Sequence, residues 1–145
     1  MPQQEDNKMN ELVASIFSVM RVVRERAQKS HKRDPFSILQ LETLNYVSVN
    51  GQPTMKDISN YLCITPPSAT SIVNALVKAK KLERFPDPRD RRIVRLSATA
   101  KGKREAQKWY SEKTARMKKI FAVLSEKERG EIVRLFTKIS KANHS

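Results

Sequence analysis

Apolar side chains recur at three- and four-residue intervals along much of the chain, the spacing that places them on one face of an α-helix. The first apolar stripe covers residues 9–23, and Asp34-Pro35 should end its helix. A second stripe follows, and then Thr54 and Asp57 have the spacing of a capping box that opens a short third helix. These signals predict three successive helices, at about 8–30, 37–49 and 55–62.

A fourth helix should begin within Thr65-Pro66-Pro67-Ser68, because proline is tolerated in a first helical turn, where its missing N–H has no partner. One face of this helix is apolar, and the other carries short polar side chains and a lysine. Short polar side chains let a helix approach base edges and phosphates closely, although they can also simply face water. The apolar face holds Ala69, Ile72, Val73 and Leu76, and the polar face holds Ser68, Thr70, Ser71, Asn74 and Lys78.

Two short runs after this helix predict a β-hairpin. Leu82–Phe85 and Ile93–Ala98 are too short for helices and too apolar for loops, and they flank the sequence PDPRDRR. A guanidinium is weakly hydrated and always charged, so it suits a narrow, electronegative minor groove. We expect Asp87 and Asp90 to fix the shape of the tip by pairing with one of its arginines. The arginines that should project from the tip are Arg89, Arg91 and Arg92.

The charge of the chain favours a polyanionic partner. The sequence carries 29 Lys and Arg against 15 Asp and Glu, a net charge of +14 in 145 residues. More than half of this excess lies between Lys78 and Arg104. A basic surface that serves only solubility is the alternative on charge alone. A membrane-surface anchor fits less well, because the bases are interrupted by proline, aspartate and β-branched residues instead of lining one long amphipathic helix.

Length and composition fit one domain, residues 1–145, that can bury its own core. Cys63 is the one cysteine, which excludes an intramolecular disulfide and favours a reducing cytoplasm. The stretch MPQQEDNKMNE lacks the basic start and apolar run of an export signal, and no later apolar stretch reaches membrane-spanning length. We therefore expect a cytoplasmic protein that has no membrane partner.

Two more helices are predicted after the hairpin. Thr99 or Ser97 can cap a long helix, and Ser125 with Glu128 forms a capping box that opens a final one. The terminal helices carry more apolar surface than the small central part needs to cover itself. The expected fold is therefore mainly α with a small β-hairpin wing: a winged helix-turn-helix core at about 37–98, flanked by dimerisation helices at about 8–30 and 100–143.

The chain resembles the MarR-type (multiple antibiotic resistance regulator) winged helix-turn-helix transcription regulators. The likeness covers nearly the whole chain and is most specific in ITPPSATSIVNALVKAKKLERFPDPRDRR, where the turn, the start of the recognition helix and the wing match the family's pattern. Two departures are visible, since Lys80 stands where a helix-ending glycine is usual and Lys81 replaces an apolar residue. A left-handed Lys80 would cost about 1 kcal/mol relative to glycine.

The resemblance implies a sequence-specific DNA-binding regulator, a dimeric repressor modulated by a small ligand, without a cofactor or a metal. Two recognition helices about one DNA turn apart should read an inverted repeat in double-stranded DNA. The recognition helix offers Thr65, Pro67, Ser68, Thr70, Ser71, Asn74 and Lys78. The wing offers Arg89, Asp90, Arg91 and Arg92, and one of these arginines should enter the minor groove.

The resemblance also implies a crevice for a small, anionic aromatic effector between the dimerisation helices and the winged domain. The plain alternative for each candidate lining residue is a core position. Some family members sense oxidants through a cysteine, but Cys63 lies in the helix-turn-helix turn, where we expect a buried structural side chain. The candidate lining residues are Phe17, Met20, Phe36, Tyr46, Trp109 and Tyr110.

Two other classes of function compete with a regulator. A constitutive, non-specific or architectural DNA-binding protein needs the same charge but no defined polar recognition face. Affinity for an operator compared with affinity for random duplex separates these two classes. An enzyme is not expected, because the sequence offers no metal-ligand cluster, no glycine-rich phosphate loop and no nucleophile beside an obvious base.

Overall fold

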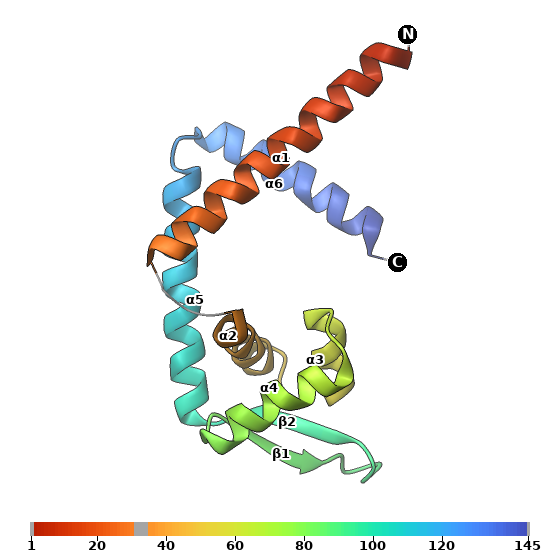
Figure 1. Ribbon diagram of the computed structural model, residues 1–145, viewed down its shortest axis with the longest axis vertical. Coiled ribbons are helices and arrows are strands. Elements are labelled where there is room, and N and C mark those ends of the chain that lie inside the picture. Colours follow the sequence, from red (N-terminus) through yellow and green to blue (C-terminus); the bar gives the residue numbers. More distant parts are fainter. Residues whose placement is uncertain (1, 31–34, 145) are drawn as a thin grey trace. The chain divides into compact units, whose positions relative to one another are not determined.

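The computed structural model describes residues 2–30 and 35–144, and within them it contains six helices and one two-stranded antiparallel sheet (Figure 1). In chain order these are α1 (Pro2–Ser30), α2 (Pro35–Val49), α3 (Met55–Leu62), α4 (Pro66–Lys78), β1 (Leu82–Pro86), β2 (Val94–Ala98), α5 (Ala100–Phe121) and α6 (Glu126–Asn143). The fold class predicted from the sequence is confirmed.

The chain divides into two compact units. One unit covers residues 31–112 and contains α2, α3, α4, the hairpin and the first part of α5. The other unit combines residues 1–30 with 113–145, and so contains α1, the end of α5 and α6. We call them the winged unit and the terminal unit.

Helix boundaries agree with the sequence prediction except at the N-terminus. Helix α1 begins at Pro2 rather than near residue 8, because the polar segment before Met9 continues the helix without adding to its apolar stripe. Of the predicted stop signal, Asp34 lies outside the described residues. Pro35 is the first residue of α2, a position where its missing N–H is not needed.

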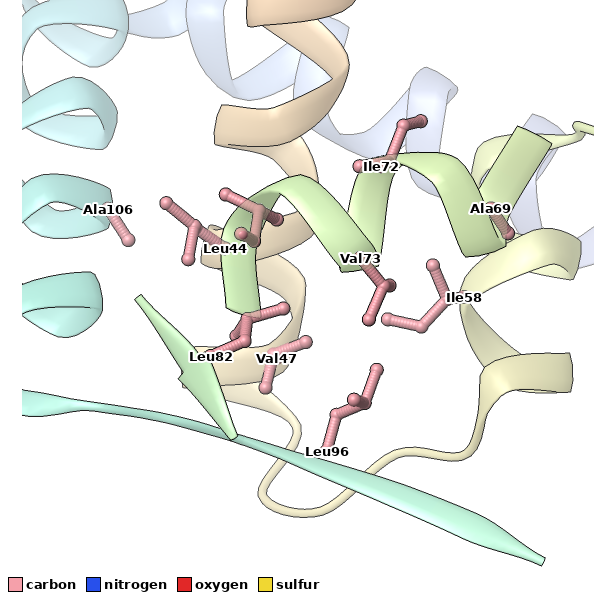
Figure 2. Close-up of a cluster of buried hydrophobic side chains, with 10 residues drawn as sticks. Leu44, Val47, Ile58, Ala69, Ile72, Val73, Leu82, Leu96 and Ala106 are labelled. Atoms are coloured by element: carbon pink, nitrogen blue, oxygen red, sulfur yellow. The ribbon is translucent and has the colours of Figure 1, made fainter. Parts of the chain in front are cut away.

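The core of the winged unit lies between its helices and the hairpin (Figure 2). Three helices pack on one another and on β2, and α4 also packs on β1. The apolar face predicted for α4 is the buried one, which turns the polar face of the same helix outward. The buried core side chains are Leu44, Val47, Ile58, Ala69, Ile72, Val73, Leu76, Leu82, Leu96 and Ala106.

Two N-caps fix the helix-turn-helix locally. The predicted capping box before α3 is present: the Asp57 N–H donates to Thr54 Oγ1 at 3.2 Å, and the Thr54 N–H donates to Asp57 Oδ2 at 2.9 Å. Thr65 is the N-cap of α4 and accepts from the Ser68 N–H at 3.3 Å, with prolines filling the first helical positions. These caps set where both helices begin, and therefore which side chains α4 presents.

The hairpin pairs Leu82 with Ala98 at its base and Pro86 with Val94 near its tip. Its inner edge is bound to the segment before α3, because the Leu96 N–H donates to Pro53 O at 2.9 Å and a bridge joins Thr54 to Arg95. Backbone hydrogen bonds thus tie the wing to the start of the helix-turn-helix.

The end of α4 is a Schellman motif with a lysine in the glycine position. Lys80 has a φ of 58°, its N–H donates to Val77 O at 3.0 Å, and the Lys81 N–H donates to Leu76 O at 2.9 Å. The left-handed conformation expected for Lys80 is therefore confirmed. The departure at Lys81 places an ammonium instead of an apolar group here, and this ammonium pairs with Glu105 of α5 at 2.8 Å.

Helix α5 starts against this motif. Thr99, one of the two predicted caps, accepts from the Gly102 N–H at 3.1 Å and donates through its hydroxyl to Lys80 O at 2.7 Å. The Thr99 N–H donates to Lys81 O at 3.1 Å. Gly102 is buried, and a Cβ added to it would lie 2.1 Å from that same carbonyl oxygen. The junction between α4 and α5 therefore requires glycine.

The terminal unit buries little of its own apolar surface. Among the described side chains of α1 and α6, none is buried. The predicted capping box of α6 is present, with the Ser125 N–H donating to Glu128 Oε1 at 2.8 Å, and this bond holds the pKa of Glu128 below its ordinary value. The large apolar side chains left exposed on the two helices are Met9, Leu12, Val13, Ile16, Phe17, Val19, Met20, Val22, Val133, Leu135, Phe136 and Ile139.

Candidate nucleic-acid interface

The polar face of α4 is exposed along its whole length and carries the predicted side chains Ser68, Thr70, Ser71, Asn74 and Lys78. Thr65 and Pro67 at the start of the helix are exposed as well. An exposed helix with small polar side chains has the dimensions and the hydrogen-bonding groups that a DNA major groove accepts.

The hydroxyl groups of this face differ in how they are already used. Thr65 Oγ1 donates to Ser68 Oγ at 2.9 Å, and Thr70 Oγ1 donates to Pro66 O at 3.0 Å. The hydroxyl of Ser71 makes no hydrogen bond within the described ranges, and Ser68 keeps its own proton. Ser68 and Ser71 therefore remain available to donate to a ligand, whereas Thr65 and Thr70 offer mainly acceptor and methyl groups.

A side-chain contact links this face to the wing. Nη2 of Arg84, which is exposed on β1, donates to Oδ1 of Asn74, which is exposed on α4. Figure 1 shows α4 beside the hairpin, as this contact requires. The sequence analysis did not include Arg84 in the site. No local signal could have found it, because Arg84 is ten residues from Asn74 and reaches it only once the Schellman turn has folded the hairpin back.

Asp87 organises the base of the wing tip from a buried position, 6% exposed. Its Oδ1 accepts from the backbone N–H of Arg89 at 2.7 Å and of Asp90 at 3.1 Å, while Oδ2 accepts from Nε of Arg95. Arg95 also donates to Gln52 O at 2.7 Å. The Arg95 guanidinium, followed by the Arg89 N–H, holds the pKa of Asp87 below its ordinary value.

Asp90 organises the outer part of the tip. It accepts from Nε of Arg92 at 3.0 Å, from Nη2 of Arg92 at 3.1 Å and from the Arg92 N–H at 3.1 Å. These contacts hold the pKa of Asp90 below its ordinary value. The expected pairing between acids and arginines is thus present, but it uses two arginines, and Arg95 was not among those predicted.

The tip leaves two guanidinium groups without a partner. Within the part of the chain that the structure describes, the side chains of Arg89 and Arg91 make no hydrogen bond or ion pair, and both are exposed. The third predicted arginine, Arg92, is held against Asp90. The geometry therefore presents Arg89 and Arg91 for contact with another molecule on a base that Asp87 holds in place.

The six candidate effector residues lie in different surroundings. Phe17 and Met20 are exposed on α1 of the terminal unit, and the other four belong to the winged unit. There, Phe36 and Tyr110 are exposed, Tyr46 stacks on Tyr61 with ring centroids 4.2 Å apart, and Trp109 is buried. Only Trp109 borders a pocket described within the winged unit, a hollow of about 220 Å³ lined by Leu41, Glu105, Lys108, Trp109 and Glu112.

The expectation of a buried Cys63 is wrong. The thiol is exposed, because Cys63 is the left-handed C-cap of α3 with a φ of 53°, and this conformation turns its side chain away from the core. No group of three or more metal-ligating side chains occurs in the described ranges. No helix there is long and apolar enough to cross a membrane.

Comparison with known proteins agrees with this geometry. Residues 36–94 match the model of the MarR family. The chain is 26% identical over 134 residues to the uncharacterized HTH-type transcriptional regulator YpoP of Bacillus subtilis (strain 168), covering 92% of each chain.

Two solved structures share the fold. The structure of Streptococcus pneumoniae FabT in complex with DNA has 25% identity and a TM-score of 0.69, over 93% of this chain and 94% of that one. NadR in complex with 4-hydroxyphenylacetate has 25% identity and a TM-score of 0.65, over 90% of this chain and 89% of that one. The chain therefore belongs to the MarR family of DNA-binding winged helix-turn-helix transcriptional regulators, and it is not an enzyme.

Proposed function

We propose that this regulator binds an inverted-repeat operator in double-stranded DNA as a homodimer, represses transcription there, and releases the operator in response to a small ligand. The observation that carries the proposal is the exposed polar face of α4 beside a rigid wing tip with two free guanidinium groups. One element suits a major groove, and the other suits the neighbouring minor groove. FabT, which shares the fold, has been crystallised with DNA.

In this proposal the recognition helix supplies base contacts through Ser68, Ser71 and Asn74, and phosphate contacts through Lys78. Thr65 and Pro67 contribute at the start of the helix, and Thr70 contributes packing. Arg89 or Arg91 enters the minor groove, while Asp90 and Arg92 keep the tip in shape. The wing assignment rests on the contrast between the free and the paired arginines.

The exposed apolar side chains of the terminal unit support the homodimer. Phe17 is 64% exposed and Phe136 is 58% exposed in the single chain. Monomeric proteins rarely leave apolar surface of this extent uncovered, and a two-fold axis lets the same faces cover each other. We assign the dimer contact to helices at about 8–30 and 100–143, and the DNA-binding core to about 37–98.

The ligand part of the proposal rests on one relative and one pocket. NadR has been crystallised with 4-hydroxyphenylacetate, a small anionic aromatic compound. In this chain the hollow beside Trp109 offers an indole ring and the ammonium of Lys108 for such a compound, next to two acidic side chains. Because a transcription regulator acts where the DNA is, we place the protein in the cytoplasm.

The decisive experiment selects bound sites from a pool of random duplexes with the purified protein. We expect an inverted repeat with half-site centres about 10 base pairs apart, bound at least about a thousandfold more tightly than random duplex. Equal affinity for both would instead identify a non-specific, architectural DNA-binding protein. Sedimentation at micromolar concentration should show a dimer that Phe136→Glu dissociates, and a wild-type monomer would contradict the proposal.

The wing assignment has its own test. Arg91→Gln should lower operator affinity and reduce the slope of log affinity against log salt concentration by about one, as expected for one lost charge contact. Lys127→Gln removes the same charge from the exposed surface of α6 and serves as the matched control. Identical salt slopes for the two variants would refute a role for Arg91 in DNA binding.

A further inference from the structure

We propose that Arg84 fixes Asn74 as a hydrogen-bond donor toward DNA, so that the Asn74–Arg84 pair selects guanine, and not adenine, at one position of each half-site. This inference rests on the proposed function, because it concerns how the recognition helix reads its operator. It assigns Arg84, a wing-strand residue, to sequence specificity.

The pair is placed where base edges would be read. Asn74 lies on the same exposed face of α4 as Ser71 and Lys78, one turn away from each. Arg84 approaches it from β1, whose backbone is paired with β2 in a defined register. Within the described ranges the Arg84 guanidinium has no carboxylate partner, so Asn74 is the group that orients it.

The chemistry of the two groups settles the orientation of the amide. A guanidinium carries five N–H donors and no acceptor, so only the oxygen of the Asn74 amide can face it. The NH₂ group of Asn74 then points away from Arg84 with its donors unused. Since the remaining N–H groups of Arg84 are donors too, the pair offers only donors to an approaching molecule.

The base that matches a donor-only surface follows from the groups on the major-groove edges. Guanine presents two neighbouring acceptors, N7 and O6, whereas adenine presents an acceptor beside a donor. An asparagine reads adenine through both its oxygen and its NH₂ group, and here the oxygen of Asn74 is occupied. Reading adenine would require breaking the contact with Arg84.

Docking on DNA strengthens the constraint. In the free protein both side chains are exposed, and water can compete for the contact. When DNA excludes that water, the local dielectric falls, and a hydrogen bond between a guanidinium and an amide oxygen becomes harder to give up. The preference for guanine therefore appears in the complex, where it matters for recognition.

The experiment repeats the operator selection with Arg84→Met, which removes the donors and keeps an unbranched side chain at an exposed position. Loss of Arg84 frees Oδ1 of Asn74, so one position of each half-site should shift from guanine toward adenine, by at least about fivefold in relative affinity. Arg104→Met removes the same charge from an exposed position of α5 and should leave the base preference unchanged.

A second measurement keeps the test sharp if the shift is small. Replacing that guanine by 7-deazaguanine removes one acceptor, and it should weaken binding by wild type more than binding by Asn74→Ala. A wild type without any base preference would overturn the proposed function. A specific wild type whose preference is the same in Arg84→Met, or whose loss with 7-deazaguanine is the same in Asn74→Ala, would overturn this inference alone.

Discussion

The junction between α4 and α5 gives a sharp prediction, because the same substitution should have opposite effects at two helical glycines. In Gly102→Ala the new methyl group would lie 2.1 Å from Lys81 O and 3.3 Å from Cδ2 of Leu44. The carbonyl cannot simply yield, because it accepts the Thr99 N–H at 3.1 Å. The backbone must therefore open by about 1 Å, which is overpacking of a tight contact.

The magnitude follows from three contributions. Overpacking of this kind costs about 1 to 3 kcal/mol. Weakening the hydrogen bond between Thr99 and Lys81 costs about 1 kcal/mol more. Alanine recovers about 1 kcal/mol over glycine within a helix. The free energy of unfolding of Gly102→Ala should therefore be lower than that of wild type by about 1 to 3 kcal/mol.

Gly130→Ala is the matched control. A Cβ at Gly130 meets nothing within 4 Å, and the residue lies on the polar face of α6 with Glu126 and Arg134. This variant should be more stable than wild type by about 0.5 to 1 kcal/mol. Urea unfolding at one fixed protein concentration measures both variants, since dimerisation makes stability depend on concentration. If Gly102→Ala were as stable as Gly130→Ala, the close approach at the junction would be refuted.

Two further predictions concern the left-handed lysine and the buried acid of the wing. Lys80→Gly should raise the free energy of unfolding by about 1 kcal/mol in the same urea assay, because glycine has no penalty at a φ of 58°; unchanged stability would contradict a strained lysine. Because the folded-state pKa of Asp87 is lowered, its ionised form stabilises the wing above the ordinary value of 3.8, and this contribution is lost as the pH falls through the lowered pKa. Asp87→Asn should accordingly be less stable than wild type at pH 7, with a difference that shrinks on acidification; a difference that persists at the lowest pH would refute the ion pair as its source.

Local signals predicted the elements of the fold well. The capping boxes at Thr54 and Ser125 and the prolines after Thr65 each mark a helix start within a few residues, so sequence spacing alone was enough to place them. The left-handed Lys80 was also predictable, since it stands where the family has glycine.

Contacts that depend on the folded hairpin were not predictable in the same way. Arg95 reaches Asp87 across the two strands, and Arg84 reaches Asn74 across the turn. Both pairings depend on strand register and on the angle of the hairpin, which charge patterns do not encode. Cys63 was misjudged because its surroundings were inferred from what is usual at that position and not from its φ angle.

The hydrogen bond from Leu96 to Pro53, with the bridge from Arg95 to Thr54, makes the wing a continuation of the backbone that leads into α3. Bending the hairpin away from the helices would break both links, so each protomer carries one stiff reading head. A signal that silences such a protein has little to gain by reshaping the head. It acts most economically by changing the spacing between two heads, so that their grooves no longer fall in phase on the duplex.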